Sequence, residues 1–184
     1  MRRLYIALGA ATVYLASVIL ANWLTTHYGF VPVGFGKVAT AGTFAAGGAL
    51  VVRDVLQDAI GRIGVLLLIV TAAALSWIVA APQIALASGC AFLLAETFDM
   101  LVYTPMRRRT RFGDPGWTAA VWCAGVVGAI ADTIVFLRIA FGWPAVWSGL
   151  PGQLLGKCEM LAALIAIGVM SRALLRQSLD ARSA

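Results

Sequence analysis

Six apolar runs of about 20 residues each occupy most of this 184-residue chain, and only short polar connections separate them. A helical run of this length matches the hydrocarbon thickness of a bilayer. Of all residues, 61% are hydrophobic and 12% are charged, unlike a water-soluble domain. The runs lack the polar and apolar alternation of barrel strands. The sequence therefore predicts an all-α integral membrane protein with one domain over residues 1–184, a six-helix bundle with spans at 4–24, 38–56, 63–81, 84–103, 117–141 and 150–170.

Basic residues are distributed unevenly among the connections between these runs. If the N-terminus is cytoplasmic, eleven of the 14 basic residues fall in inner segments, Lys37 falls in an outer loop, and Arg138 and Lys157 lie within runs. This asymmetry follows the positive-inside rule and predicts cytoplasmic N- and C-termini in the cell membrane. The net charge of +6 is then mostly topological, so the expected partner of the basic segments is membrane lipid and not nucleic acid.

Four charged residues lie deep inside the last three runs: Glu96, Asp99, Asp132 and Lys157. Each charge near the centre of a membrane helix costs roughly 2.5–3.5 kcal/mol, so such residues usually serve an ion or a polar solute. The helical rise places them at similar depths, and we expect them to face one substrate-binding cavity. A purely structural ion pair between Asp132 and Lys157 is the alternative. Asn22 in the first run is expected to bind a polar ligand or to link two helices.

Arg53, Asp54 and Asp58 end the second run near the predicted cytoplasmic interface. Immediate neighbours on a helix do not face each other, so Arg53 and Asp54 are not expected to pair, whereas Asp54 and Asp58 share a face. These two like charges require cationic partners, for which Arg62 and the arginines after the fourth run are candidates. The segment is either an inner gate or a solvated loop.

The sequence lacks the residues that common catalytic and cofactor-binding sites require. His27 is the single histidine, so neither a Ser-His pair nor a multi-histidine metal site is available. Cys90, Cys123 and Cys158 have no metal-ligand or disulfide spacing. The stretch 152–158 is one residue short of a phosphate-binding loop and does not follow a strand. We expect no enzyme, no cofactor and no metal.

Short motifs follow one another in a consistent order over roughly residues 17–160. They are Ala41-Gly-Thr-Phe, Arg53-Asp54, Gly61-Arg62, Ala95-Glu96-Thr-Phe-Asp99-Met-Leu-Val-Tyr103, Val127-Gly128, Asp132-Thr133, Gly152-Gln153 and Lys157. In this combination the chain resembles the queuosine precursor transporter family, also labelled the vitamin uptake transporter family. The resemblance implies a six-helix importer of 7-cyano- or 7-aminomethyl-7-deazaguanine in the cytoplasmic membrane. The family's Asn shortly before the fifth-run aspartate is missing from residues 129–131, which leaves the exact base open.

A deazapurine base suits the buried charges. Its amide and amino groups can donate hydrogen bonds to carboxylates, and its ring acceptors can accept them from lysine or asparagine. We therefore expect a substrate site built from Glu96, Asp99, Asp132, Lys157 and Asn22. We also expect Arg53 and Asp54 to shape an inner gate, and Phe44, Phe92 or Trp122 to supply a stacking face.

Two other functions remain open at this point. The chain could be the substrate-capturing subunit of an energy-coupling-factor transporter, with energising partner subunits or as a homo-oligomer, and Ala7-x-x-x-Ala11 offers a close-packing surface for docking. It could instead be a structural or regulatory membrane protein, or an intramembrane enzyme, in which the buried charges only specify helix pairing. The sequence does not indicate a coupling ion.

Overall fold

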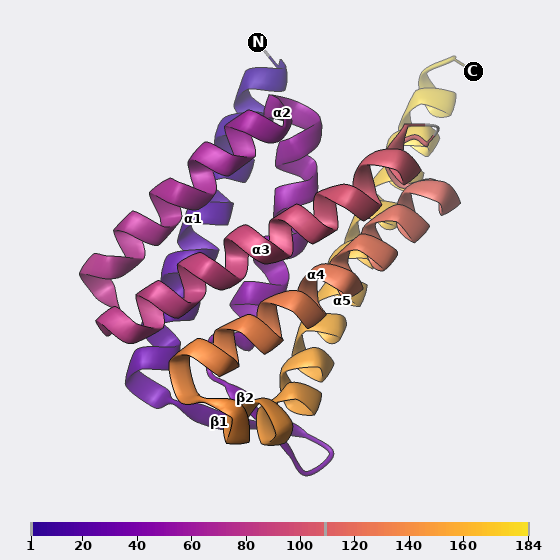
Figure 1. Ribbon diagram of the computed structural model, residues 1–184. Coiled ribbons are helices and arrows are strands. Elements are labelled where there is room, and N and C mark those ends of the chain that lie inside the picture. The colour runs from indigo at the N-terminus through magenta and orange to yellow at the C-terminus, as the bar shows by residue number, and fades with distance from the viewer. Residues whose placement is uncertain (1, 109, 184) are drawn as a thin grey trace.

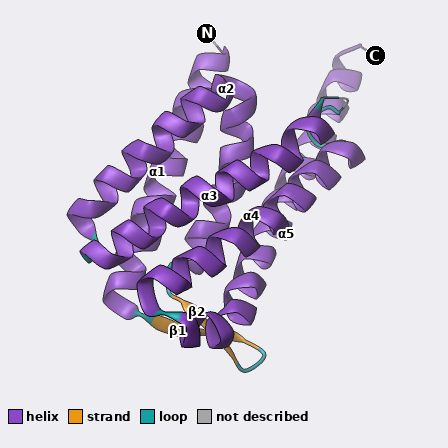
Figure 2. Cartoon of the chain, in the orientation of Figure 1, coloured by secondary structure: helices purple, strands orange, loops and turns teal. Residues whose placement is uncertain are grey.

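The computed structural model describes residues 2–108 and 110–183, and their fold is a helical bundle with one small hairpin (Figures 1 and 2). Five of its helices are long and apolar enough to cross a membrane, which confirms the prediction of a helical membrane protein. The elements in chain order are α1 (Arg2–Tyr28), β1 (Phe30–Gly34), β2 (Lys37–Thr40), α2 (Thr43–Val79), α3 (Pro82–Arg107), α4 (Pro115–Phe141) and α5 (Trp143–Ser183).

Helix α2 is broken at Gly61, where φ is 74° and ψ is 175°. A positive φ of this kind strains any residue with a Cβ, which explains the glycine at this position. A straight helix of 37 residues would measure about 55 Å, far more than the roughly 30 Å of a bilayer core. Figure 1 shows the chain turning back at the break. The parts on either side, 43–60 and 62–79, coincide with the predicted runs 38–56 and 63–81 apart from their ends.

The connections of the bundle divide between its two ends. Figure 1 shows the bend of α2, the α3–α4 connection, the start of α1 and the end of α5 at one end of the bundle. The hairpin of β1 and β2 lies at the opposite end, beside the α4–α5 connection. Most arginine-bearing connections therefore share one end, and the hairpin that carries Lys37 occupies the other.

The hairpin corrects the prediction that the second span starts at residue 38. Strands β1 and β2 pair antiparallel, with Phe30 opposite Thr40, and α2 begins only at Thr43. The tight connection forms because Gly34 and Gly36 both adopt positive φ. The hairpin packs directly on α5, since a Cβ added to Gly152 would lie 1.9 Å from the carbonyl oxygen of Val38. Apolarity alone could not separate this strand from the helix that follows it.

Small side chains allow the helices to pack closely, while large apolar side chains face outward. Ala120, Ala124 and Gly128 of α4 are buried between helices. In contrast, Ile78 is 79% exposed and Leu101 is 67% exposed. An inverted arrangement of this kind suits a hydrocarbon solvent, in which large apolar residues face lipid and small ones mediate helix contacts.

Asp114 forms the N-cap of α4. Its carboxylate accepts hydrogen bonds from the backbone N–H of Trp117 at 2.6 Å and of Arg111 at 2.7 Å. These hydrogen bonds hold the pKa of Asp114 below its usual value, because they favour the charged form. The cap fixes the start of the helix that carries Asp132.

Candidate functional site

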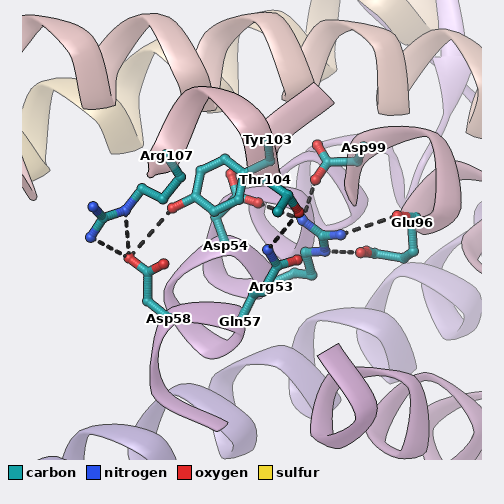
Figure 3. Close-up of polar contacts among 9 residues, drawn as sticks. All are labelled: Arg53, Asp54, Gln57, Asp58, Glu96, Asp99, Tyr103, Thr104 and Arg107. Atoms are coloured by element: carbon teal, nitrogen blue, oxygen red, sulfur yellow. Dashed lines mark hydrogen bonds and ion pairs between the residues drawn. The ribbon is translucent and has the colours of Figure 1, made fainter. Parts of the chain in front are cut away.

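Arg53 is the centre of a buried ion-pair cluster between α2 and α3 (Figure 3). Its fully buried guanidinium forms ion pairs with Asp54, Glu96 and Asp99, and these four residues are called the Arg53 cluster below. Nη1 donates to Asp54 Oδ1 at 2.8 Å, and Nη2 donates to the backbone carbonyl of Glu96 at 3.1 Å. Glu96 and Asp99 reach the same guanidinium because residues three apart share one face of a helix.

Two expectations about Arg53 are wrong. Arg53 and Asp54 do pair, because the long arginine side chain folds back far enough to reach the neighbouring carboxylate. The segment is also not a solvated loop, since it lies within α2, and Arg53 is 0% exposed and Asp54 is 1% exposed. An arginine fork can satisfy several carboxylates at once, and this explains its position among three of them.

A polar chain continues from this cluster toward the C-terminal end of α3 (Figure 3). Gln57 donates to Thr104 Oγ1 at 3.4 Å, and the Tyr103 hydroxyl donates to Asp58 Oδ2 at 3.5 Å. Arg107 donates to the same Asp58 oxygen from Nε at 2.9 Å and forms an ion pair through Nη2 at 2.7 Å. The predicted pairing of Asp58 with an arginine beyond the fourth run is confirmed.

A second buried ion pair joins α4 to α5. Lys157 pairs with Asp132, and its Nζ donates to Thr133 Oγ1 at 2.8 Å. The α2 helix packs tightly behind the lysine, because a Cβ added to Gly47 would lie 2.9 Å from the Lys157 Cα. The predicted Asp132–Lys157 ion pair is confirmed. It contains one charge of each sign, whereas the Arg53 cluster contains three carboxylates and one cation.

The Asp132–Lys157 pair forms one wall of a narrow cavity enclosed by α1, the start of α2, α3, α4, α5 and strand β2. The cavity has a volume of about 20 Å³, room for roughly one water molecule, whereas small-molecule sites typically measure roughly 300–1,000 Å³. A small-molecule ligand therefore fits only after the surrounding helices move apart. Apolar surface comes from Phe92 and Phe136. Its polar walls come from Asn22, Thr25, Ser88, Asp132, Gln153 and Lys157. Convergent polar groups on an apolar frame are typical of a ligand site.

Two hydrogen bonds fix polar residues at the cavity wall. Asn22 Nδ2 donates to Ser76 Oγ at 2.8 Å and thereby links α1 to α2. Gln153 Nε2 donates to Thr40 Oγ1 of β2 at 3.1 Å and links α5 to the hairpin. The helix-linking role considered for Asn22 is therefore present, and the same side chain lines the cavity.

The predicted carboxylates do not all face one cavity. Asp132 lines it, but Glu96 and Asp99 are not among its lining residues. They continue the face of α3 that carries Ser88 and Phe92, one to two turns farther along the helix, where the Arg53 guanidinium pairs with them. The expectation of a single shared cavity is wrong.

The three aromatic residues expected to stack on a base occupy different surroundings. Phe92 is buried and lines the cavity. Phe44 is 36% exposed and lines an outer groove between α1, α2 and α5. Trp122 is 40% exposed on α4. Of these residues, Phe92 alone is placed to contact a molecule in the cavity.

Sequence reasoning missed Ser88, Gln153 and Thr40. A signal existed for Gln153, because it precedes Lys157 by four residues and so shares its helix face. Ser88 has the same relation to Phe92. Thr40 had no such signal, because its place at the cavity depends on the packing of the hairpin against α5.

Other parts of the molecule offer weaker candidates. A larger hollow between the second part of α2 and α3 is lined by apolar residues and Cys90, with no charged group to orient a polar solute. Within residues 2–108 and 110–183, no group of three or more His, Cys, Asp or Glu side chains is arranged to hold a metal ion.

Comparison with known proteins gives one match. The profile of a family described as "Putative vitamin uptake transporter" matches residues 5–174, which is most of the chain. No curated protein and no solved structure matches. The family resemblance seen in the motifs is confirmed.

Proposed function

The chain belongs to this family of vitamin uptake transporters, and from that premise we propose that it imports a queuosine precursor, 7-cyano- or 7-aminomethyl-7-deazaguanine, or a similar purine-like base. The observation that carries the proposal is the narrow cavity with the Asp132–Lys157 pair in its wall. A buried ion pair that opens onto a cavity inside a membrane bundle is typical of a polar-solute site.

The donors and acceptors of the cavity match those of a deazaguanine. Asp132 accepts hydrogen bonds from the amide and amino groups of the base, and Lys157 donates to its carbonyl oxygen. Ser88 and Gln153 supply uncharged donors and acceptors for the remaining edge. Phe92 provides an apolar face for the ring. The charges of the site balance, which suits a neutral base such as 7-cyano-7-deazaguanine better than the cationic 7-aminomethyl compound.

We propose that the two parts of α2 cross the membrane separately, which gives six crossings with both termini in the cytoplasm. The break at Gly61 and the position of both chain ends at one end of the bundle support this topology (Figure 1). The arginine-bearing connections at that end suit a cytoplasmic surface in the cell membrane, and the hairpin then faces outward.

The test is uptake of labelled deazaguanine bases by cells that cannot synthesise them. The intact protein gives saturable uptake, and Asp132→Asn lowers the rate at least tenfold because it removes the acceptor charge. Ser88→Ala changes no charge and lowers apparent affinity about 2- to 10-fold, as expected for one lost hydrogen bond. Ser171→Ala is the matched control, because its hydroxyl is exposed and donates only to the backbone of its own helix.

Membrane levels of each variant are measured in the same cells. Absence of uptake by the intact protein, when it is present in the membrane, overturns the proposed substrate. Uptake by purified protein in vesicles separates a self-sufficient importer from a subunit that needs energising partners.

A further inference from the structure

We propose that Glu96 binds and releases the proton that drives import, so that the Arg53 cluster is a proton site next to the substrate cavity. The proposal rests on the proposed import function for its coupling role. The proton site itself does not depend on that function.

The Arg53 cluster contains more negative than positive charge. Asp54, Glu96 and Asp99 have side chains no more than 2% exposed, and in the described part of the chain their ion pairs all go to Arg53. With all three ionised, two negative charges are uncompensated inside a membrane bundle. Such charge is strongly disfavoured where water is excluded, and a carboxylate that takes up a proton removes it.

Glu96 is the member best placed to hold the proton. Its Oε2 contacts Arg53 Nε only as an ion pair, its Oε1 has no partner among the described residues, and the side chain is fully buried. Both Asp54 Oδ1 and Asp99 Oδ2 accept hydrogen bonds from Arg53 Nη1. A proton on Glu96 turns one unpartnered acceptor into a donor and leaves the Arg53 hydrogen bonds to the two aspartates intact.

Tyr14 of α1 is an independent observation that points to the same position. Its side chain is 0% exposed, and its hydroxyl has no hydrogen-bond partner among the described residues. It lies within electrostatic reach of Glu96, Arg53 and Asp132. Tyr14 packs in the same buried cluster as Phe92, which lies one turn before Glu96 on α3. A buried hydroxyl near a carboxyl group can accept a hydrogen bond from its protonated form.

Charged and titratable groups surround Glu96 from every helix of the bundle. They are Tyr14 on α1, Arg53 and Asp54 on α2, Asp99 on α3, Asp132 on α4 and, behind Asp132, Lys157 on α5. Lys157 is already paired with Asp132 and adds no net charge.

The two sites are coupled through charge. Ionised Glu96 and Asp132 repel each other across a region of low dielectric, and protonation of Glu96 removes that repulsion. The ionised Asp132 then binds the base more tightly. Coupling of this kind is reciprocal, so bound base also favours the protonated Glu96. The step adds one proton to a carboxylate on the acidic outer side and releases it on the inner side, with no other reactant.

The experiment uses the purified full chain in lipid vesicles with labelled 7-cyano-7-deazaguanine. Counterflow without a pH gradient measures binding and movement of the base, and accumulation under an inside-alkaline gradient measures proton coupling. One coupled proton gives the intact protein up to about tenfold accumulation per pH unit. Glu96→Gln, which mimics the protonated form, shows counterflow but loses accumulation. Vesicles that contain Tyr14→Phe are expected to accumulate the base more slowly than those with the intact protein, and their counterflow is expected to be unchanged.

Glu159→Gln is the matched control, because Glu159 is an exposed glutamate on α5, and it accumulates the base as the intact protein does. Accumulation by Glu96→Gln equal to that of the intact protein overturns the proposal. So does the loss of both counterflow and accumulation in monodisperse Glu96→Gln, because Glu96 then acts in base binding or movement.

A second readout needs no transported base. The infrared carbonyl band of a protonated carboxyl group, followed against pH, is expected in the intact protein and in Glu159→Gln, and is lost in Glu96→Gln. If the intact protein shows no counterflow, the proposed substrate fails, and this band still tests the proton site. Absence of a band assignable to Glu96 overturns the inference even if uptake is observed.

Discussion

The two buried ion-pair groups of this bundle differ in charge balance and in what they border. The Asp132–Lys157 pair is balanced and lines a cavity, whereas the Arg53 cluster has three carboxylates around one cation and lies outside that cavity. A balanced pair can hold a neutral solute without changing charge. An unbalanced cluster can change its charge by taking up a proton, and this difference underlies the proposed division between a base-binding site and a proton site.

The largest effect is expected from Arg53→Met. The substitution leaves Asp54, Glu96 and Asp99 buried without a cation, so unfolding becomes easier by about 5 kcal/mol, the upper end of the range for a broken buried ion pair. Thermal unfolding of the purified protein in detergent measures the change. Arg53→Lys keeps the charge but not the planar guanidinium. Its stability is therefore expected to lie between that of the intact protein and that of Arg53→Met. Unchanged unfolding of Arg53→Met would mean that the three carboxylates are already neutral.

Loss of one carboxylate from each group is expected to lower stability by different amounts. Asp132→Asn leaves Lys157 as a buried unpaired cation and lowers stability by about 3 kcal/mol, toward the lower end of the range because Thr133 still accepts from Nζ. Asp99→Asn removes charge from a cluster that has too much of it and lowers stability by about 1 kcal/mol or less. Thermal unfolding of both variants at one pH gives the comparison. Equal losses would contradict the difference in charge balance.

Sequence reasoning located the buried charges and the Asp132–Lys157 pair, but not the partner of Glu96 and Asp99. The apolar runs identify the membrane helices, and the cost of charge in lipid singles out Glu96, Asp99, Asp132 and Lys157 as exceptional. Which carboxylate meets which cation depends on the rotation of each helix, and packing determines that rotation. Arg53 illustrates the limit, because its place after an apolar run suggested an interface, whereas its side chain is fully buried.

The hairpin and Tyr14 were beyond sequence reasoning for different reasons. Residues 38–40 are as apolar as the helix that follows, and only the positive φ of Gly34 and Gly36 and the contact with α5 define the strand. Tyr14 lies in an apolar run and looks like an ordinary core aromatic. Its relation to Glu96 depends on the packing of α1 against α2 and α3.

An intermediate effect is expected where α2 packs against Lys157. Gly47→Ala places a Cβ 2.9 Å from the Lys157 Cα, closer than real contacts allow, so α2 and α5 must move apart. Overpacking of this kind lowers stability by about 1–3 kcal/mol, and displacement of Lys157 also lowers base uptake. Gly48→Ala is the matched control, because its added Cβ meets Met160 Cγ at an ordinary 3.7 Å. Equal behaviour of both variants would show that α2 and α5 can separate without disturbing the pair.

The smallest effect is expected from the ion pair between Asp58 and Arg107. Its side chains are 31% and 24% exposed, so water and salt weaken an attraction that would be strong in the interior. Asp58→Asn lowers stability by about 0.2–1 kcal/mol, and the difference from the intact protein shrinks as salt is added. Thermal unfolding at low and high ionic strength measures both features. A loss as large as that of Asp132→Asn, or one insensitive to salt, would show that this pair belongs to the buried network and not to its exposed end.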